Sequence, residues 1–241
     1  MANEWNEQVP ARTRDAVGEL VSSLKAAFGE DLASVVLHGS AVRGPFDPET
    51  SDVDLVVVLK HDGGAKLDAA RRAFTLARSA ERIEAMILTK EEIARAADVF
   101  PLLYEDIGRH GVALHGEQLF SALTISHAHR RLRIEQELRE ARIRMRRVRV
   151  DFGDTPLKLA GALERKTKQL RSAFFSLLAL KGTSVADSAA EVFRATASAY
   201  GVSIPNVLAP RANPTAAFDE LAALLDKAIA DVDAMESRGH G

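Results

Sequence analysis

The chain has 241 residues, of which 46% are hydrophobic and 27% charged, with no cysteine and a formal net charge of −2. This composition is typical of a globular protein with one large or two small domains, and it excludes collagen-like and disordered chains. No apolar run approaches the roughly 18 residues that span a bilayer. The absence of cysteine excludes disulfides, thiolate metal ligands and a cysteine nucleophile. Since the N-terminus lacks the basic start and apolar core of a signal peptide, we expect a cytoplasmic protein that does not bind a membrane.

The small net charge is the sum of two unequal parts. Residues 1–120 contain 13 Lys and Arg and 20 Asp and Glu, whereas residues 130–171 contain 14 basic and 6 acidic residues. An acidic part joined to a basic stripe is typical of a site that binds a metal together with a phosphate. Two ordinary solvated surfaces explain the charges equally well, so charge alone leaves both interpretations open.

The first half of the chain predicts an α/β pattern. Apolar residues at helical spacing predict a helix over 11–28, which Gly29 ends. The nearly unbroken Val and Leu run at 53–59 predicts a strand that is covered on both faces. Thr89, with Glu92 three residues later, forms a capping box that predicts the start of a short helix. The other expected elements are strands over 32–37, 82–88 and 112–114 and helices over 65–80 and 101–107.

After about residue 120, strand signals end and helical patterns follow. We therefore expect a domain over 1–120 and an α-helical domain over 121–241. Pro156 near a helix start and Gly182 after its end fit the usual punctuation of helices. The arginines between 130 and 149 are expected to be solvated or paired with glutamates one helical turn away, Glu135, Glu137 and Glu140. The expected helices cover 126–150, 156–181, 184–200 and 214–236.

One stretch has the features of a phosphate and metal site. It reads Leu37-His38-Gly39-Ser40-Ala41-Val42-Arg43-Gly44 and, after seven residues, Asp52-Val53-Asp54. Gly39 lets the backbone approach a ligand closely, and the helix N-terminus that follows offers unpaired N–H groups to an anion. Asp52 and Asp54 are two residues apart on a strand, so both carboxylates leave the same face and repel each other unless a cation lies between them. Mg²⁺ prefers carboxylates together with phosphate oxygens.

Each half of this motif also has an ordinary interpretation. A Gly-Ser pair is most often a turn, and an isolated Asp-x-Asp is most often a solvated strand end. Here, however, the strand that carries the two carboxylates is otherwise apolar, and buried carboxylates need a compensating partner. The combination of the two halves is therefore much more specific than either half and favours a nucleotide and metal site.

Gly39-Ser40, the eleven-residue gap and Asp52-Val53-Asp54 together resemble the signature of the nucleotidyltransferase superfamily typified by DNA polymerase beta. The surrounding residues are similar to small bacterial aminoglycoside and minimal nucleotidyltransferases, over about residues 30–118 of this chain. The resemblance implies an α/β (α+β) catalytic domain with a mixed sheet, followed by an all-α helical bundle that matches more loosely. The gap is one residue longer than in the minimal type, which a loop tolerates.

The resemblance also implies a third carboxylate on the next strand. Glu84 is the one carboxylate within the predicted strand, although the family position is more often Asp, and a surface glutamate on an edge strand is the alternative. The implied ligands of two Mg²⁺ ions are Asp52, Asp54 and Glu84, with Glu84 as metal ligand or as general base. The predicted nucleotide-binding residues are Gly39, Ser40, Arg43, Ser51, Lys158 and Lys166.

The implied reaction transfers a nucleoside monophosphate to a hydroxyl group with release of pyrophosphate, and AMP from ATP is the first candidate. We expect a small-molecule acceptor, because a helical bundle could form the far wall of an acceptor cleft. Two alternatives are adenylylation of a partner protein and a non-catalytic nucleotide-binding module, and the three clustered carboxylates argue against the second. Nucleic acid is not expected as a partner, since the helical half offers no platform of aromatic residues for base stacking.

Overall fold

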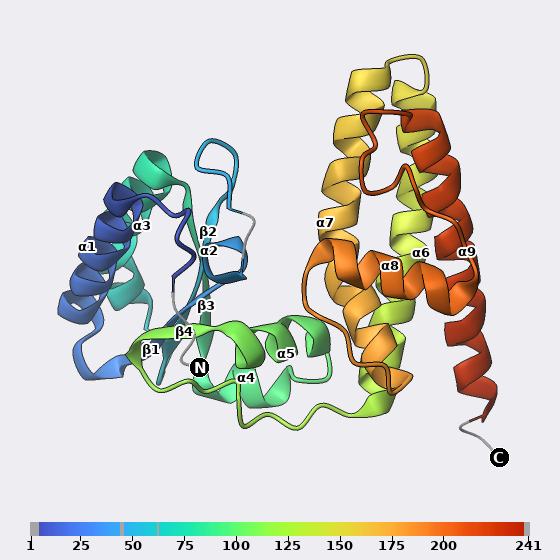
Figure 1. Ribbon diagram of the computed structural model, residues 1–241. Coiled ribbons are helices and arrows are strands. Elements are labelled where there is room, and N and C mark those ends of the chain that lie inside the picture. Colours follow the sequence, from blue (N-terminus) through green and yellow to red (C-terminus); the bar gives the residue numbers. More distant parts are fainter. Residues whose placement is uncertain (1–4, 44–45, 62, 239–241) are drawn as a thin grey trace. The chain divides into compact units, whose positions relative to one another are not determined.

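The computed structural model describes residues 5–43, 46–61 and 63–238, so Gly44 and Pro45 of the motif lie outside the described residues. The chain forms two compact units, the first ending at Ile125 and the second beginning at Ser126 (Figure 1). The expected domains, 1–120 and 121–241, stay a prediction, because compactness alone does not show that either unit folds or functions by itself.

A mixed four-stranded sheet forms the centre of the first unit, with the strand order β3-β2-β1-β4. β1 (Leu32–His38) pairs antiparallel with β2 (Val53–Leu59) and with β4 (Val112–Gly116), whereas β2 pairs in parallel with β3 (Ile83–Thr89). Six of the seven residues of β2 are buried, as its apolar sequence predicts for a strand covered on both faces. β3 is an edge strand, and Met86 on it is exposed.

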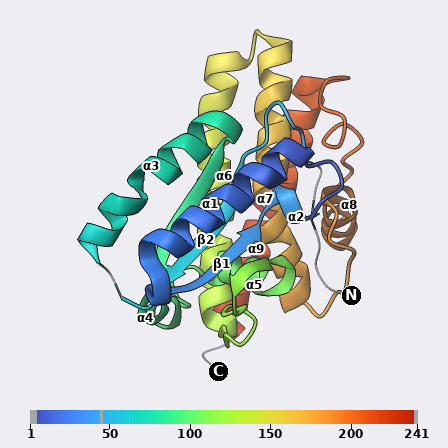
Figure 2. The ribbon, with the colours of Figure 1, turned by 90° about the vertical axis from the view of Figure 1, so that its left-hand side faces the viewer.

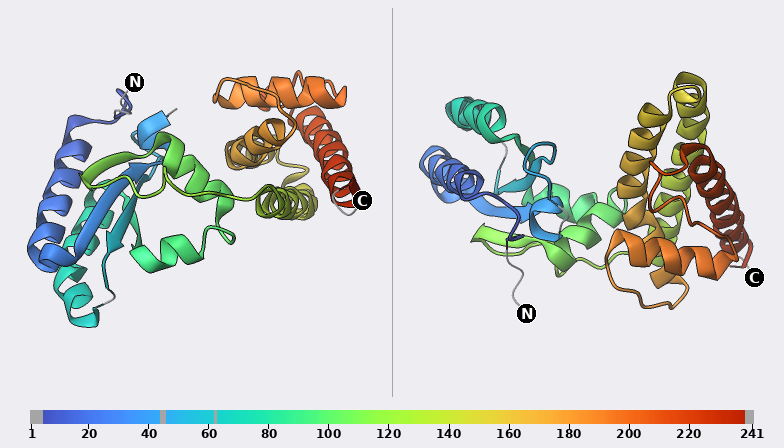
Figure 3. Two further views of the ribbon diagram at one scale, coloured as in Figure 1. Left: turned by 90° about the horizontal axis from the view of Figure 1, so that it is seen from below. Right: turned by 45° about the horizontal axis from the view of Figure 1, so that its top comes forward.

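Helices cover both faces of this sheet (Figures 2 and 3). On one face, α1 (Ala11–Phe28) and α3 (Gly64–Glu81) lie side by side. On the other face lie α4 (Lys90–Arg95) and α5 (Pro101–His110). Each face buries its own apolar cluster, so successive residues of β2 face opposite cores. Core residues include Val17, Leu24, Phe28, Leu55 and Val57 on the α1 side and Val56, Val58, Ile93, Tyr104 and Ile107 on the α5 side.

Local signals explain where several elements begin and end. The predicted capping box at Thr89 is confirmed, because its hydroxyl accepts from the N–H of Glu92 and the Glu92 carboxylate accepts from the N–H of Thr89. The prediction that a strand begins at Arg82 is wrong by one residue, because Arg82 ends α3 in the left-handed conformation with φ 50°. α5 extends to His110, three residues beyond the predicted end.

The second unit is helical, as predicted. α6 (His127–Phe152), α7 (Pro156–Leu180) and α9 (Pro214–Arg238) contact one another, and α8 (Ala189–Tyr200) contacts α7 and α9 (Figure 1). The predicted start of α8 at residue 184 is wrong, because Ser188 caps the helix by accepting from the N–H of Glu191. None of the described helices is both long and apolar enough to cross a membrane. Buried residues of this unit include Ile134, Leu138, Met145, Leu163, Phe174, Leu177, Phe193, Leu221, Leu225 and Val232.

Most arginines of α6 have acidic partners within this unit, which confirms the pairing predicted from helical spacing. The pairs within α6 include Arg131–Glu135 at 2.9 Å, Arg139–Glu135 at 2.8 Å, Arg133–Glu137 at 3.0 Å, Arg144–Glu140 at 3.2 Å and Arg147–Asp151 at 2.8 Å. Arg139 and Arg142 also pair with Asp233 and Asp226 on α9, each at 2.7 Å. Much of the basic stripe is therefore neutralised by the helices that carry and contact it.

Candidate active site

The turn after β1 presents a backbone suited to an anion. Gly39 has φ +70°, and it is followed directly by the short helix α2 (Ser40–Arg43). A Cβ at Gly39 would overlap the Oδ2 oxygen of Asp54 and lie 3.3 Å from its Cγ. Glycine is therefore required twice, for the positive φ and for the close approach of a carboxylate. Because the first N–H groups of a helix have no partner within it, the start of α2 offers hydrogen-bond donors beside that carboxylate.

Strand pairing brings the three predicted carboxylates to one end of the sheet. Asp54 lies opposite His38 in the β1–β2 ladder and opposite Glu84 in the β2–β3 ladder. Asp52 precedes β2 by one residue, and its side chain is 57% exposed, whereas Asp54 is only partly exposed. Since Val56 contributes to the core on the α5 side, strand alternation places Asp54 on that same side of the sheet.

The surroundings of Asp54 disfavour its charge. Burial, and to a smaller extent the negative charge of Asp52, raise the pKa of Asp54 from 3.8 to about 6, and Glu84 acts in the same direction. Arg43 opposes this shift. Burial lowers the pKa of His38 to about 4, so the imidazole next to Asp54 in the sheet is neutral at pH 7. Asp54 is therefore an acidic group whose ionised form lacks sufficient positive charge close by.

This donor set fits a divalent cation. A cation bound between the carboxylates would compensate for the burial and the repulsion that together raise the pKa of Asp54. The three candidate ligands offer only oxygen atoms, which are the donors that Mg²⁺ prefers. Asp52, Asp54 and Glu84 are thus the residues that would hold the metal.

Ser40 connects the two halves of the motif, and Ser51 orders the loop between them. The Ser40 hydroxyl donates to the carbonyl of Asp52 at 3.5 Å, so the Gly-Ser turn and the Asp-x-Asp segment lie against each other. Ser51 lies in the loop before Asp52, where its hydroxyl accepts from the N–H of Asp47 at 3.0 Å. This contact gives Ser51 a structural role in the loop, and its predicted contact with a nucleotide stays a prediction.

Arg43 does not point freely into solvent. Its Nη2 lies 2.9 Å from the Oδ2 of Asp106 on α5, and the two side chains are 24% and 10% exposed. The sequence predicts a nucleotide contact for Arg43, and this largely buried ion pair was not predicted. Asp106 was missed as part of the site, although a carboxylate on the buried face of an amphipathic helix is a signal that a partner exists.

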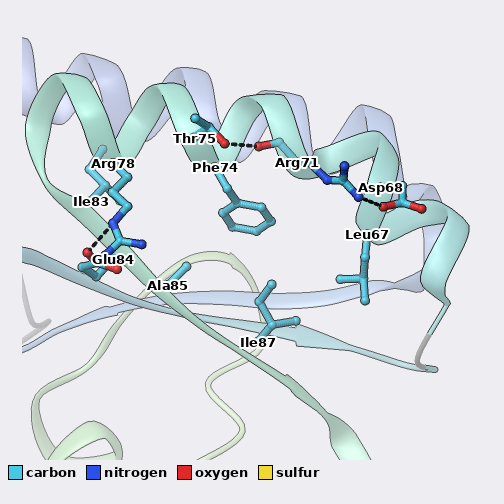
Figure 4. A pocket seen from close by; sticks show the side chains of 10 residues that line it. All are labelled: Leu67, Asp68, Arg71, Phe74, Thr75, Arg78, Ile83, Glu84, Ala85 and Ile87. Atoms are coloured by element: carbon cyan, nitrogen blue, oxygen red, sulfur yellow. Dashed lines mark hydrogen bonds and ion pairs between the residues drawn. The ribbon is translucent and has the colours of Figure 1, made fainter.

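Glu84 lies beside Asp54 in the sheet and also forms an ion pair with an arginine of α3. Its register places it beside Asp54, yet its Oε1 lies 2.9 Å from the Nε of Arg78 on α3. Figure 4 shows this pair at one end of a pocket of about 500 Å³ between α3 and β3, with Phe74, Ala85 and Ile87 further along. The carboxylate is 46% exposed, so the ion pair leaves it accessible. Glu84 was predicted from the sequence, but its ion pair with Arg78 was not.

The two predicted lysines belong to the second unit. Lys158 lies in the first turn of α7, and Lys166 lies two turns further along the same helix. The Nζ of Lys166 donates to Gln169 at 2.9 Å, and partial burial together with the charge of Arg144 lowers the pKa of Lys166. Their proposed contact with a triphosphate stays a prediction, as does the nucleotide-binding role of the residues in the first unit.

Comparison with known proteins identifies the family. The family model for the nucleotidyltransferase domain matches residues 17–144, slightly more than half of the chain. The chain belongs to the nucleotidyltransferase domain family. The match includes β1, α2, β2 and β3, and with them all the predicted site residues of the first unit.

This nucleotidyltransferase is similar to spectinomycin adenyltransferase AAD(9) from Enterococcus faecialis, whose structure was determined with ATP and spectinomycin. The identity is 15% and the TM-score 0.46, and the alignment covers 88% of this chain and 99% of the other. No curated protein sequence matches the chain. The chain is thus a nucleotidyltransferase enzyme with a mixed-sheet domain followed by helices.

Proposed function

We propose that this enzyme transfers a nucleoside monophosphate, with AMP from ATP as the first candidate, to a hydroxyl group of a small molecule and releases pyrophosphate. The observation that carries the proposal is the position of Asp54, which lies against Gly39 at the start of α2 and next to Asp52 and Glu84. An anion-binding turn and a carboxylate cluster that fits Mg²⁺ thus meet at one point. Nucleotidyl transfer needs both, because the donor substrate is a metal-bound triphosphate.

Each residue then has a defined role. Asp52 and Asp54 hold the metal, and the backbone N–H groups at Ser40 and Ala41, with the Ser40 hydroxyl, bind the β- and γ-phosphates. When bound, Mg²⁺ neutralises the charge that develops on the attacking and leaving oxygens. Holding both substrates in line supplies much of the remaining catalysis. Ser51, Lys158 and Lys166 are proposed as further nucleotide contacts.

Glu84 is proposed to receive the acceptor's proton or to hold the metal at the acceptor. The acceptor oxygen forms a bond to the α-phosphorus, the bond from that phosphorus to the pyrophosphate oxygen breaks, and the hydroxyl proton passes to a base. The Glu84 carboxylate is accessible and lies in register with Asp54, which supports this role. Arg43 neutralises charge from beside the cluster, while Asp106 holds it in place.

We also propose that residues 1–120 form the catalytic domain and residues 121–241 a C-terminal α-helical domain. The decisive experiment incubates the full chain and Mg²⁺ with each labelled nucleoside triphosphate, a panel of hydroxyl acceptors that includes aminoglycosides, and no acceptor. Pyrophosphate release and transfer of label are measured. Label on a small molecule supports the proposal, and label on protein alone would instead support the protein-adenylylating alternative.

The matched variants are Asp54→Asn and Asp68→Asn. Asp68 lies on α3, where its side chain is 67% exposed and pairs with Arg71 on the same helix. Asp54→Asn is expected to abolish Mg²⁺-dependent turnover, whereas Asp68→Asn should leave it unchanged. An active Asp54→Asn enzyme would overturn the metal assignment, and the absence of pyrophosphate release with any combination would overturn the proposed reaction.

A further inference from the structure

Arg82 has a backbone conformation that is unusual for its residue type. It is the one non-glycine residue in the described part of the chain with positive φ, at 50°. It ends α3, where its N–H donates to the Arg78 carbonyl at 3.0 Å, and its own carbonyl accepts from the N–H of Val53 at 3.1 Å. The residue therefore joins the end of α3 to the beginning of β2. Glycine is the residue that usually occupies such a position, because an L side chain is strained there.

The side chain of Arg82 contacts the loop that leads into Asp52. Its Nη2 donates to the carbonyls of Ser51 at 2.9 Å and Pro48 at 3.4 Å, and its Nη1 donates to the carbonyl of Glu49. Its Nε lies 3.6 Å from the Oδ1 of Asp52. One planar guanidinium thus contacts four residues of a single loop, an arrangement that needs its fixed fork of donors.

The same loop is ordered from within by Asp47. The Asp47 carboxylate accepts from the N–H of Glu49 at 3.0 Å and from the hydroxyl of Thr50 at 2.5 Å. The Asp47 carbonyl accepts from the N–H of Ser51 at 2.8 Å. These bonds give the loop a defined shape, but they do not attach it to the rest of the unit. The contacts with Arg82 supply that attachment on the α3 side.

We infer that Arg82 is a positioning residue, which fixes the loop 47–52 so that Asp52 stands beside Asp54 before a metal and nucleotide bind. The inference rests on the proposed function, since it assigns the cation to Asp52 and Asp54. The ion pair of Arg82 with Asp52 is exposed, and an exposed pair alone contributes little. Its effect therefore depends on the bonds to the loop carbonyls, which set the position of the Asp52 backbone.

A purely electrostatic role for Arg82 predicts the opposite change in metal affinity. If Arg82 acted only through its charge, it would compete with a divalent cation for Asp52, and its removal would strengthen metal binding. If Arg82 positions the loop, its removal weakens metal binding, because residues that orient metal ligands affect affinity by roughly 10- to 100-fold. The direction of the change therefore distinguishes the two roles.

The test compares Arg82→Gly, Arg82→Lys and the wild type as full-length chains. Glycine keeps the positive φ without strain and deletes the side chain, so the fold is expected to persist. Lysine keeps the charge but lacks the planar fork. Arg71→Gln, which removes an exposed arginine within α3 that does not contact the loop, is the matched control. Mn²⁺ binding is measured from the paramagnetic signal of the free ion, and hydrogen exchange is followed in the peptide that contains 47–52.

We expect Arg82→Gly to weaken Mn²⁺ binding about tenfold and to speed exchange in the loop, with Arg82→Lys restoring only part of both. The Mg²⁺ concentration for half-maximal pyrophosphate release should rise in parallel, while the rate at saturating Mg²⁺ changes much less. Arg71→Gln should match the wild type in each measurement, and thermal unfolding shows whether each variant is folded.

Unchanged or tighter Mn²⁺ binding by a folded Arg82→Gly chain would overturn the inference, even in an active enzyme. If the wild type binds Mn²⁺ and the Arg82 variants behave as expected but no pyrophosphate is released, the proposed reaction fails and the inference stands. A wild-type chain that binds no Mn²⁺ would overturn both.

Discussion

Replacing Asp54 by Asn should stabilise the first unit while it abolishes nucleotidyl transfer. Asp54 is partly buried, lies against the backbone at Gly39, and is repelled by Asp52 and Glu84. Its pKa is raised from 3.8 to about 6, so the folded chain binds the Asp54 proton more tightly than the unfolded chain does. In the absence of a cation, ionised Asp54 therefore disfavours folding, and an amide that never ionises removes this cost.

The magnitude follows from the pKa shift. One pKa unit corresponds to 1.36 kcal/mol, so a shift from 3.8 to about 6 amounts to about 3 kcal/mol. The stability that the proton contributes is fully present below pH 3.8 and is lost as the pH rises through about 6. The advantage of Asp54→Asn in the free energy of unfolding should therefore grow from about 1.5 kcal/mol at pH 5 to about 3 kcal/mol at pH 8.

The assay is urea unfolding of the full chain in EDTA at both pH values. The single tryptophan, Trp5, contacts the core between α1 and the sheet, so its fluorescence reports on the first unit. Asp68→Asn serves as the control, because its exposed carboxylate should give no comparable gain. Adding Mg²⁺ should then stabilise the wild type but not Asp54→Asn.

The refuting results are specific. If Asp54→Asn is no more stable than the wild type at pH 8, Asp54 is not held in a destabilising environment and the raised pKa is wrong. If the gain is equal at pH 5 and pH 8, the stabilisation does not come from the ionisation of Asp54. In either case the electrostatic argument for a cation between Asp52 and Asp54 would lose its physical basis.

Three further substitutions test other parts of the site. Asp106→Asn should lower the free energy of unfolding by about 2 kcal/mol, because it leaves the largely buried Arg43 guanidinium without its counterion. An unchanged urea midpoint would contradict this expectation. Gly39→Ala should reduce pyrophosphate release at least about 100-fold, since the added Cβ overlaps Asp54 and the positive φ becomes strained; normal kinetics would show that the close approach is not needed. Glu84→Gln should reduce the rate about 100-fold with little effect on stability, and near-full activity would exclude Glu84 as base or metal ligand.

Most helices and strands could be predicted from the sequence, because the patterns that specify them are local. The apolar run at 53–59, the capping box at Thr89 and the helical spacing of the second unit each depend on residues a few positions apart. The errors occurred where one nearby side chain decides the outcome. Ser188 begins α8 later than predicted, and Arg82 adopts a left-handed conformation that a propensity argument assigns to glycine.

In the candidate site, too, local features could be predicted and long-range contacts could not. Gly39, Ser40, Asp52 and Asp54 were found from the sequence because the turn and the alternating strand need these residue types at these spacings. Whether they contact ATP and Mg²⁺ stays a prediction. The partners of the site residues could not be predicted, because Arg43 meets Asp106 and the loop at 48–52 meets Arg82 from distant parts of the chain.

The sequence by itself therefore determined the type of the main elements and the positions of Gly39, Ser40, Asp52 and Asp54, since these follow from local patterns and spacing, and its resemblance to known proteins indicated the family. Only the tertiary structure decided how those charges are balanced. Packing α5 against the sheet pairs Asp106 with Arg43, packing α3 beside β3 pairs Arg78 with Glu84, and burial raises the pKa of Asp54. The acidic and basic residues are unequally distributed along the chain, but the effect of each charge depends on its burial and on its distance from other charges. Both are set by contacts between segments that are far apart in the sequence.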